Sequence, residues 1–146
     1  ENFYLGYRKT ALQADEVLCW IVVPKPMPGE QLVHDKVSKR WEDDISAVCL
    51  AMQWHLKNGA VQSVRIAAGG VAATPARAYQ TEAVLAAQPW NETTLSKAQH
   101  TLAQEFSPIS DMRASADYRR MLLRQLLQRA WLAQQGHAVT QLGDLS

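Results

Sequence analysis

The most regular pattern in the chain is an alternation of apolar and small or polar residues over the segment VCLAMQWHLK, residues 48–57. A period of two places successive side chains on opposite faces of a β-strand, so one face of this strand is strongly apolar. Asn58-Gly59 follows, and this pair favours a type I′ turn because both positions need positive φ. We therefore predict an antiparallel hairpin formed by residues 45–57 and 60–69.

A shorter apolar run, EVLCWIVV at residues 16–23, precedes the segment PKPMPG at residues 24–29. Its β-branched composition is typical of a strand, and the proline and glycine residues indicate a loop, which we expect to continue to about Trp41. We expect the strand near residue 20 to pair with the hairpin, which gives a three-stranded antiparallel sheet.

The second half of the chain has helical patterns. Thr74-Pro75 is typical of an N-cap followed by proline at the first helical position, so a first helix is expected from there to about Ala87. A second helix is expected from Asn91, and a third from residues 111–115 to about Gln135. Residues 136–146 are expected to form a tail. The predicted fold is one α+β domain, residues 1–146, with a three-stranded antiparallel sheet packed against three helices.

Composition narrows the possible partners. The formal charge is +1, which gives no electrostatic case for nucleic acid or an anionic membrane, and no apolar run approaches the ~18 residues of a membrane span. The two cysteines form no CxxC motif, so we expect neither a zinc site nor an iron–sulfur site. With only two cysteines a disulfide framework is also not expected, and we expect a reducing, cytoplasmic location. Because the chain begins with Glu1 rather than methionine, we expect a processed product or a piece of a longer chain.

Most candidate sites have a structural explanation. The four histidines lack metal-ligand spacing, and Cys19 and Cys49 are expected to be buried, inert thiols. Residues 68–71 (AGGV) lack the full GxGxxG motif and indicate a backbone bend between strand and helix. Four arginines near the C-terminus are expected to form a solvated face: Arg119, Arg120, Arg124 and Arg129. We predict no catalytic residue and no metal ligand in this chain.

The charged segment DKVSKRWEDDI, residues 35–45, is the remaining candidate site. Its composition alone is typical of a solvated loop. Its predicted place on a loop that enters a central strand favours function, and a lysine there could stabilise developing negative charge on a ligand. The residues themselves do not identify that ligand.

Four stretches, taken in order, resemble the C-terminal domain of the FAD-binding portion of molybdenum hydroxylases, and among these the small subunit of bacterial xanthine dehydrogenase. They are FYLGYRKT (3–10), KVSKR with DDISAV (36–40 and 43–48), GGVAATPARA (69–78) and PISDMRASADYR (108–119). The resemblance implies a small antiparallel sheet with three helices. It also implies a module that helps to form the flavin site of an NAD-dependent enzyme.

In that family a molybdenum centre hydroxylates a purine, 2Fe-2S clusters carry the electrons to FAD, and FAD reduces NAD. The resemblance implies that Lys36 approaches the flavin ring and that Asp43 and Asp44 lie beside it, where nicotinamide access is controlled. The residue before the lysine is often aromatic in the family, whereas here it is Asp35. The FAD would be shared with a preceding domain. The molybdopterin-binding large subunit and the 2Fe-2S domains would be partners whose cofactors this chain does not bind.

Two alternatives remain open. The chain could be a free-standing α+β interaction module without a redox role, or the same domain of a carbon monoxide or aldehyde dehydrogenase. Whether the chain belongs to a xanthine dehydrogenase or to a related dehydrogenase, we expect the isolated chain to have little or no FAD affinity and no activity, because one side of a pocket lacks most contacts.

Overall fold

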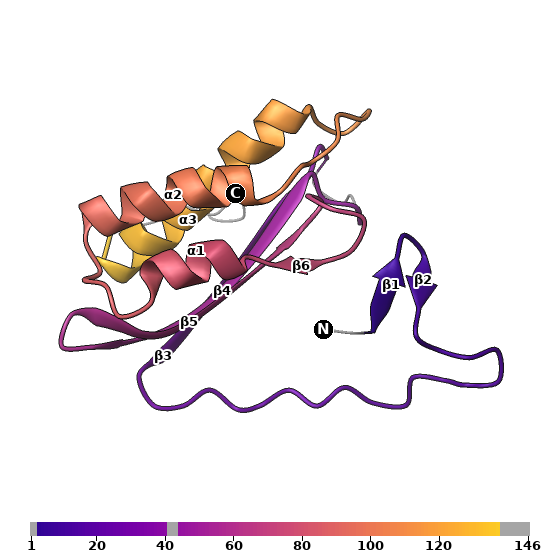
Figure 1. Cartoon of the computed structure of the whole chain (residues 1–146), viewed down its shortest axis with the longest axis horizontal. Coiled ribbons are helices and arrows are strands. Elements are labelled where there is room, and N and C mark those ends of the chain that lie inside the picture. Colours follow the sequence, from indigo (N-terminus) through magenta and orange to yellow (C-terminus); the bar gives the residue numbers. More distant parts are fainter. Residues whose placement is uncertain (1–2, 41–43, 138–146) are drawn as a thin grey trace.

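The protein forms an antiparallel sheet that carries helices on one face (Figure 1). The structure, a computed structural model, describes residues 3–40 and 44–137. The elements in chain order are β1 (Tyr4–Gly6), β2 (Lys9–Thr10), β3 (Glu30–Val37), β4 (Val48–Lys57), β5 (Ala60–Gly69), β6 (Ala76–Arg77), α1 (Tyr79–Leu85), α2 (Glu92–Glu105) and α3 (Ala116–Gln134). The predicted α+β class with three helices is confirmed. The predicted three-stranded sheet is wrong, because the main sheet has four strands in the order β3-β4-β5-β6 and β1 and β2 form a separate pair.

The central hairpin is confirmed. Strands β4 and β5 pair in antiparallel register from Cys49 opposite Gly69 to Lys57 opposite Ala60. The turn between them has φ of 53° at Asn58 and 75° at Gly59, as the type I′ preference requires. Strand β4 begins at Val48, three residues later than the predicted start of the hairpin at Ile45. Its apolar face is buried as expected, and its other face is only half-buried.

The third partner of the sheet differs from the prediction. Residues 16–23 form no strand in the described part of the chain, and β3, from within the expected loop, lies beside β4 instead. An edge strand has only one paired side and a half-buried inner face, so β3 needs few apolar residues and gives a weak pattern. The expectation of a buried Cys19 is also wrong, because Cys19 is exposed, whereas Cys49 is partly buried.

The first helix begins later than predicted. Thr74-Pro75 precede strand β6 rather than a helix, and α1 begins at Tyr79. The N-cap residue of α1, Ala78, offers no side-chain acceptor. Instead, the carboxylate of Glu105 at the end of α2 accepts hydrogen bonds from the backbone N–H of Gln80 at 2.7 Å and of Thr81 at 3.0 Å. A cap supplied by another helix leaves no local sequence signal at the start of α1.

The second and third helices have local caps. The Asn91 side chain accepts a hydrogen bond from Thr94 N at 3.0 Å, and the Ser115 hydroxyl accepts one from Tyr118 N at 3.2 Å. Both starts agree with the prediction, as does the end of α3 at Gln134. The described chain ends at His137, so the greater part of the predicted tail, residues 138–146, lies outside the described residues.

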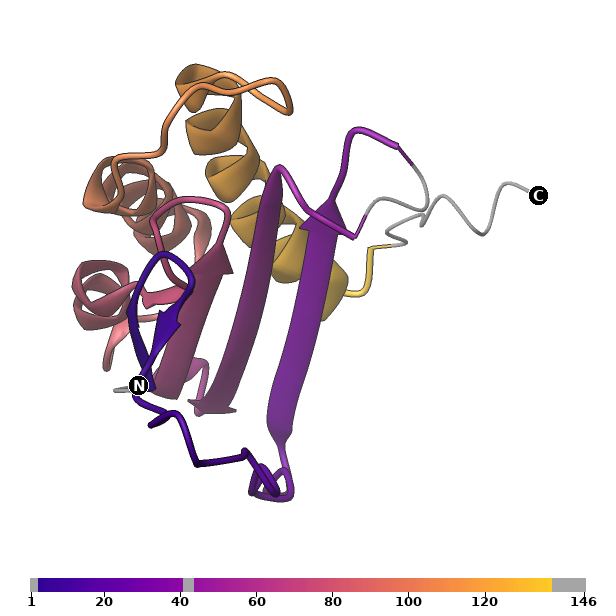
Figure 2. The same cartoon turned by 90° about the vertical axis from the view of Figure 1, so that its right-hand side faces the viewer.

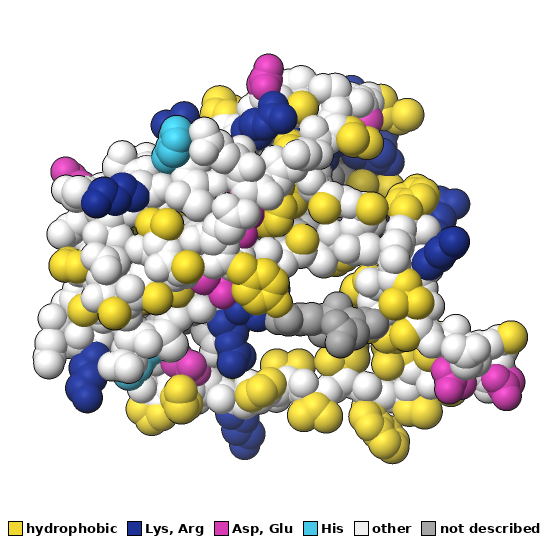
Figure 3. Space-filling view, viewed as in Figure 1, with side chains coloured by type: hydrophobic (Ala, Val, Ile, Leu, Met, Phe, Trp, Pro, Cys, Tyr) yellow, Lys and Arg dark blue, Asp and Glu magenta, His cyan; other side chains and the backbone are white. Residues whose placement is uncertain are grey.

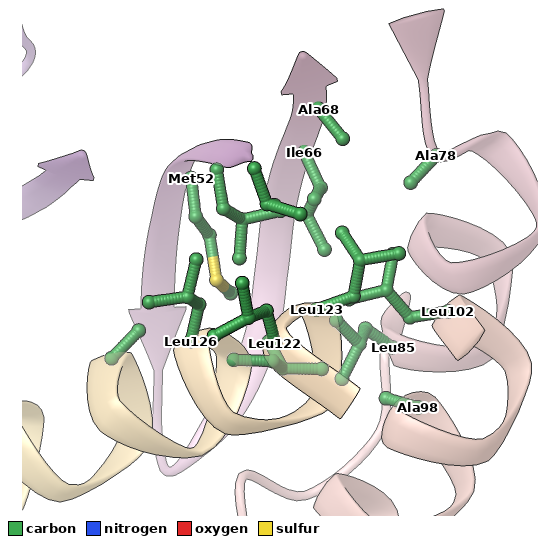
Figure 4. Close-up of a cluster of buried hydrophobic side chains, with 14 of the residues drawn as sticks. Met52, Ile66, Ala68, Ala78, Leu85, Ala98, Leu102, Leu122, Leu123 and Leu126 are labelled. Atoms are coloured by element: carbon green, nitrogen blue, oxygen red, sulfur yellow. The ribbon is translucent and has the colours of Figure 1, made fainter. Parts of the chain in front are cut away.

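The core lies between the sheet and the helices. Figure 4 shows Met52 and Ile66 of the sheet pointing toward Leu85, Leu102 and Leu123 of the three helices. All five side chains are fully buried. Each helix therefore contributes at least one leucine to the same apolar layer, and in the described part of the chain the helices cover one face of the sheet (Figure 1).

This core predicts the cost of truncation. Leu123→Ala removes a fully buried side chain and should lower the free energy of unfolding by about 2–5 kcal/mol. Leu32→Ala is the matched control, because Leu32 is 63% exposed, and its effect should stay within about 0.5 kcal/mol. Urea unfolding followed by circular dichroism measures both, and equal costs would contradict the assigned core.

Candidate functional site

Three segments that are distant in sequence meet at one end of the main sheet. They are the described parts of the connection from β3 to β4 (residues 38–40 and 44–47), the loop after β5 and the segment before α3, which Figure 2 shows above the strand ends. The Lys39 Nζ donates a hydrogen bond to the carbonyl oxygen of Met112 at 3.0 Å, which joins the first of these segments to the third. Three of the four stretches that carry the family resemblance therefore converge in space.

Arg119 of α3 holds this end of the sheet together. Its guanidinium is only 3% exposed. Nη1 donates to the carbonyl oxygens of Ala47 at 2.5 Å and Gly70 at 2.8 Å, and Nη2 donates to Asp111 Oδ1 at 2.6 Å. One buried cation thus ties α3 to the start of β4, to the end of β5 and to the segment before α3.

Sequence reasoning missed this role, since Arg119 was expected on a solvated face with the other arginines. Arg120 does fit that expectation, because its guanidinium is exposed and pairs with Asp117 at 2.8 Å. Arg129 forms an ion pair with Asp35 of β3 at 3.2 Å. The only available signal for Arg119 was its place in the stretch PISDMRASADYR.

Asp111 is held by its own backbone as well as by Arg119. Its Oδ1 accepts hydrogen bonds from the backbone N–H of Arg113 at 2.9 Å and of Ala114 at 3.1 Å. These two backbone donors, followed by the hydrogen bond and charge of Arg119, hold the pKa of Asp111 below its ordinary value of 3.8. The carboxylate therefore stays ionised opposite the buried guanidinium.

Lys36 lies on β3 rather than on the expected loop, and its side chain is exposed. In register it stands opposite Cys49, which in turn stands opposite Gly69. Its strand neighbours Asp35 and Val37 face the helices, so Lys36 faces away from them. We call the face of the sheet away from the helices the open face; near Lys36 it carries the half-buried residues Cys49, Ala51, Ala67 and Gly69. The lysine therefore stands at the rim of a shallow surface of small side chains.

Of the two predicted acidic site residues, Asp43 and Asp44, the structure describes only Asp44. Asp44 is exposed on the connection that enters β4, at the same end of the sheet as Lys36. Asp43 lies outside the described residues. The Gly70 bend is confirmed, with φ of 79° at the glycine.

A mainly apolar cavity of about 400 Å³ adjoins the loop after β5. Tyr7, from the turn between β1 and β2, lines it together with residues 70–73 and Ile109. The remaining stretch of the family resemblance, residues 3–10, therefore reaches the same end of the sheet as the other three. Among residues 3–40 and 44–137, no group of three or more His, Cys, Asp or Glu side chains could hold a metal ion, and no helix is long and apolar enough to cross a membrane.

Comparison with known proteins gives one consistent result. Residues 34–134 match the family described as the CO dehydrogenase flavoprotein C-terminal domain. The chain is 38% identical over 107 residues to the xanthine dehydrogenase/oxidase of Gallus gallus, covering 72% of this chain and 8% of that protein. It is 33% identical over 125 residues to the xanthine dehydrogenase FAD-binding subunit of Escherichia coli, covering 84% of this chain and 42% of that protein.

Solved structures agree with these relatives. A carbon monoxide dehydrogenase from Hydrogenophaga pseudoflava superimposes with a TM-score of 0.81 at 30% identity, over 88% of this chain and 44% of that one. A quinoline 2-oxidoreductase from Pseudomonas putida superimposes with a TM-score of 0.75 at 28% identity, over 90% and 45%. The chain therefore spans less than half the length of each relative and structure named here.

The bend at Gly70 gives a test of the packed sheet end. A Cβ at Gly70 would collide with the carbonyl oxygen of Ala47, the same atom that Arg119 binds. Gly59→Ala is the matched control, because Gly59 also has positive φ but has open space around it, so it should cost about 1 kcal/mol. Gly70→Ala should cost about 1–3 kcal/mol more, because it disturbs a buried hydrogen bond as well. Equal losses in urea unfolding would show that the contact is unimportant.

The ion pair of Asp111 gives a pH dependence. Since folding lowers the pKa of Asp111, its stabilisation is fully present above 3.8 and is lost as pH falls through the lower folded-state value. Asp111→Asn should therefore destabilise the protein clearly at about pH 6 and much less at about pH 3. Asp117→Asn is the matched control, because it removes a carboxylate whose side chain is 94% exposed and which pairs with the exposed Arg120 rather than with the buried Arg119. Denaturant unfolding at both pH values measures the difference, and a gap that does not narrow in acid would contradict the assignment.

Proposed function

Because the chain belongs to the family of CO dehydrogenase flavoprotein C-terminal domains, we propose that it is the C-terminal module of the FAD-binding subunit of a xanthine dehydrogenase. The observation that carries this proposal is the similarity to the Escherichia coli FAD-binding subunit over 84% of this chain but only 42% of that protein. In this role the module helps to complete a flavin site that receives electrons from purine hydroxylation and passes them to NAD.

The open face fits one side of such a site. The row from Lys36 across Cys49 to Gly69 places an exposed ammonium beside small side chains, and the adjacent row continues with Ala51 and Ala67. A flat aromatic ring system can lie against such a surface without displacing large groups. The chain has no glycine-rich phosphate-binding segment, so we propose that a preceding domain holds the rest of the FAD.

In the assembled subunit, FAD supplies the two-electron redox chemistry. Lys36 places a positive charge beside the ring, and this charge stabilises the negative charge that accompanies reduction. We propose that Asp44 and Asp43 border the approach of the nicotinamide. The ion pair between Asp35 and Arg129 supports this arrangement, because it anchors β3 to α3 directly beside Lys36.

The remaining partners follow from the same role. They are a 2Fe-2S protein or domain that delivers electrons and a large subunit with the molybdenum centre, in a cytoplasmic assembly. Substrate choice is made at the molybdenum centre, outside this chain. The xanthine dehydrogenases are favoured over the CO dehydrogenases because sequence identity is 33–38% to the former relatives named above and 30% to the latter structure.

Titration of the 146-residue chain with FAD tests the shared site. We expect no saturable change in flavin fluorescence up to roughly 100 μM FAD, because one side of a pocket provides few contacts and little preorganisation. Saturable binding below that concentration would show that the chain holds a complete flavin site and would contradict the sharing.

The role of Lys36 is tested in the FAD-loaded subunit. Lys36→Met should make the flavin midpoint potential more negative by about 30 mV or more, which is roughly 1.4 kcal/mol for a two-electron couple. Lys57→Met is the matched control, because Lys57 is exposed at the opposite end of the sheet and should leave the potential unchanged. Equal potentials in the wild-type and Lys36→Met proteins would refute the flavin contact.

A further inference from the structure

An exposed apolar segment runs outside the packed domain. We call residues 16–23 the strap. It lies within the extended stretch between β2 and β3 and passes on the side of the sheet opposite the helices in Figures 1 and 2. Its large apolar side chains are strongly exposed, from 53% at Leu18 to 84% at Val22. Figure 3 shows these apolar side chains along the lower edge of the molecule, separated from the domain by an opening.

The strap is apolar on both faces. Trp20 and Val22 point to one side of an extended chain and Ile21 and Val23 to the other, and all four are at least 74% exposed. A strand with one solvent-facing side alternates apolar and polar residues, whereas a strand covered on both faces is a continuous apolar run. The strap has the second pattern.

The strap backbone is also unpaired from Val17 to Val23, after a hydrogen bond from the backbone N–H of Glu16 to the carbonyl oxygen of Gln13 at 3.2 Å. In the described part of the chain, the hydrogen bonds of residues 17–23 are limited to a contact of 3.7 Å from Cys19 Sγ to the carbonyl oxygen of Val17. Both edges of the extended backbone are therefore open to neighbouring strands. Open edges and two apolar faces together describe an interior strand of a sheet.

The strap is not a strand of the four-stranded sheet of this domain. Residues 24–29 (PKPMPG) separate the strap from β3, and the family match begins only at His34. A second copy of the chain fits poorly, since pairing two straps covers one edge of each and leaves the other edge and both faces exposed. The relatives, in contrast, have more than half of their length outside the matched region.

We propose that the strap is an interior strand of a β-sheet in the neighbouring part of the flavoprotein, so that the boundary between the two domains lies at residues 24–29. This proposal rests on the proposed function, because it takes the neighbour to be the rest of the FAD-binding subunit. The strap passes on the side of the open face, toward which Lys36 points. The sheet that incorporates the strap therefore faces Lys36, and a ligand held between the two domains meets this lysine.

Amide hydrogen exchange tests the proposal. The strap amides should exchange freely in the 146-residue chain and at least about tenfold more slowly in the full flavoprotein that contains it. Flavin absorbance of the same flavoprotein sample gives its FAD content independently. Free exchange of the strap in a flavoprotein with full FAD content would overturn the strap proposal and leave the proposed function intact. A protected strap in a flavoprotein that binds no FAD would support the strap proposal and overturn the proposed function.

A pair of variants separates docking from folding. Ile21→Asp should leave the thermal unfolding of the 146-residue chain unchanged, because Ile21 is 74% exposed, but should remove the strap protection in the flavoprotein. Met121→Asp is the matched control, since Met121 is 46% exposed on α3, on the opposite side of the sheet, and should leave that protection intact. Loss of protection in both variants or in neither would overturn the proposal. Protection that arises in the isolated chain with rising concentration, together with a doubled mass, would assign the strap to a second copy and overturn it too.

Discussion

The buried guanidinium of Arg119 is the interaction on which the functional end of the sheet depends. Its acceptors lie on three separate segments, and each of these segments is irregular. A buried arginine requires acceptors for its donors, so the chain must bring the carbonyl oxygens of Ala47 and Gly70 to the same place. This requirement also explains why position 70 is a glycine, because a side chain there would meet the carbonyl of Ala47. The loop geometry around the candidate site thus follows from one charge.

The covering of the sheet divides the domain into two functional sides. The helices and the apolar side chains of β4 and β5 form a complete core on one face. The open face carries small residues and Lys36, and the strap lies on the same side. Stability therefore depends on the helical side, while the side proposed to bind a ligand and a neighbour contributes little to the core. This separation allows the binding side to keep exposed groups that a self-sufficient domain would bury.

Local patterns predicted the elements whose causes are local. The hairpin followed from the period of two and from Asn58-Gly59, and α2 and α3 followed from their own caps at Asn91 and Ser115. Pattern reasoning failed where the cause was distant. The strap has the strongest β-strand composition before residue 45 but pairs with no strand among residues 3–40 and 44–137, whereas β3 is a true strand with a weak pattern. The buried state of Arg119 depends on carbonyl groups 49 and 72 positions away in sequence. Lys36, Asp43 and Asp44 were assigned to the flavin site through the family resemblance rather than through periodicity, and the roles of all three stay predictions.

The capping of α1 by Glu105 has a consequence for the order of folding. A helix of seven residues is too short to persist alone, and the carboxylate that binds its first N–H groups belongs to the end of α2. During synthesis α1 emerges from the ribosome before Glu105 does, so its first N–H groups lack this carboxylate when α1 emerges. The hairpin of β4 and β5, in contrast, needs only adjacent residues. The apolar face of the newly made hairpin therefore lacks a completed α1 until Glu105 has also emerged, and the helical layer forms after the hairpin it covers.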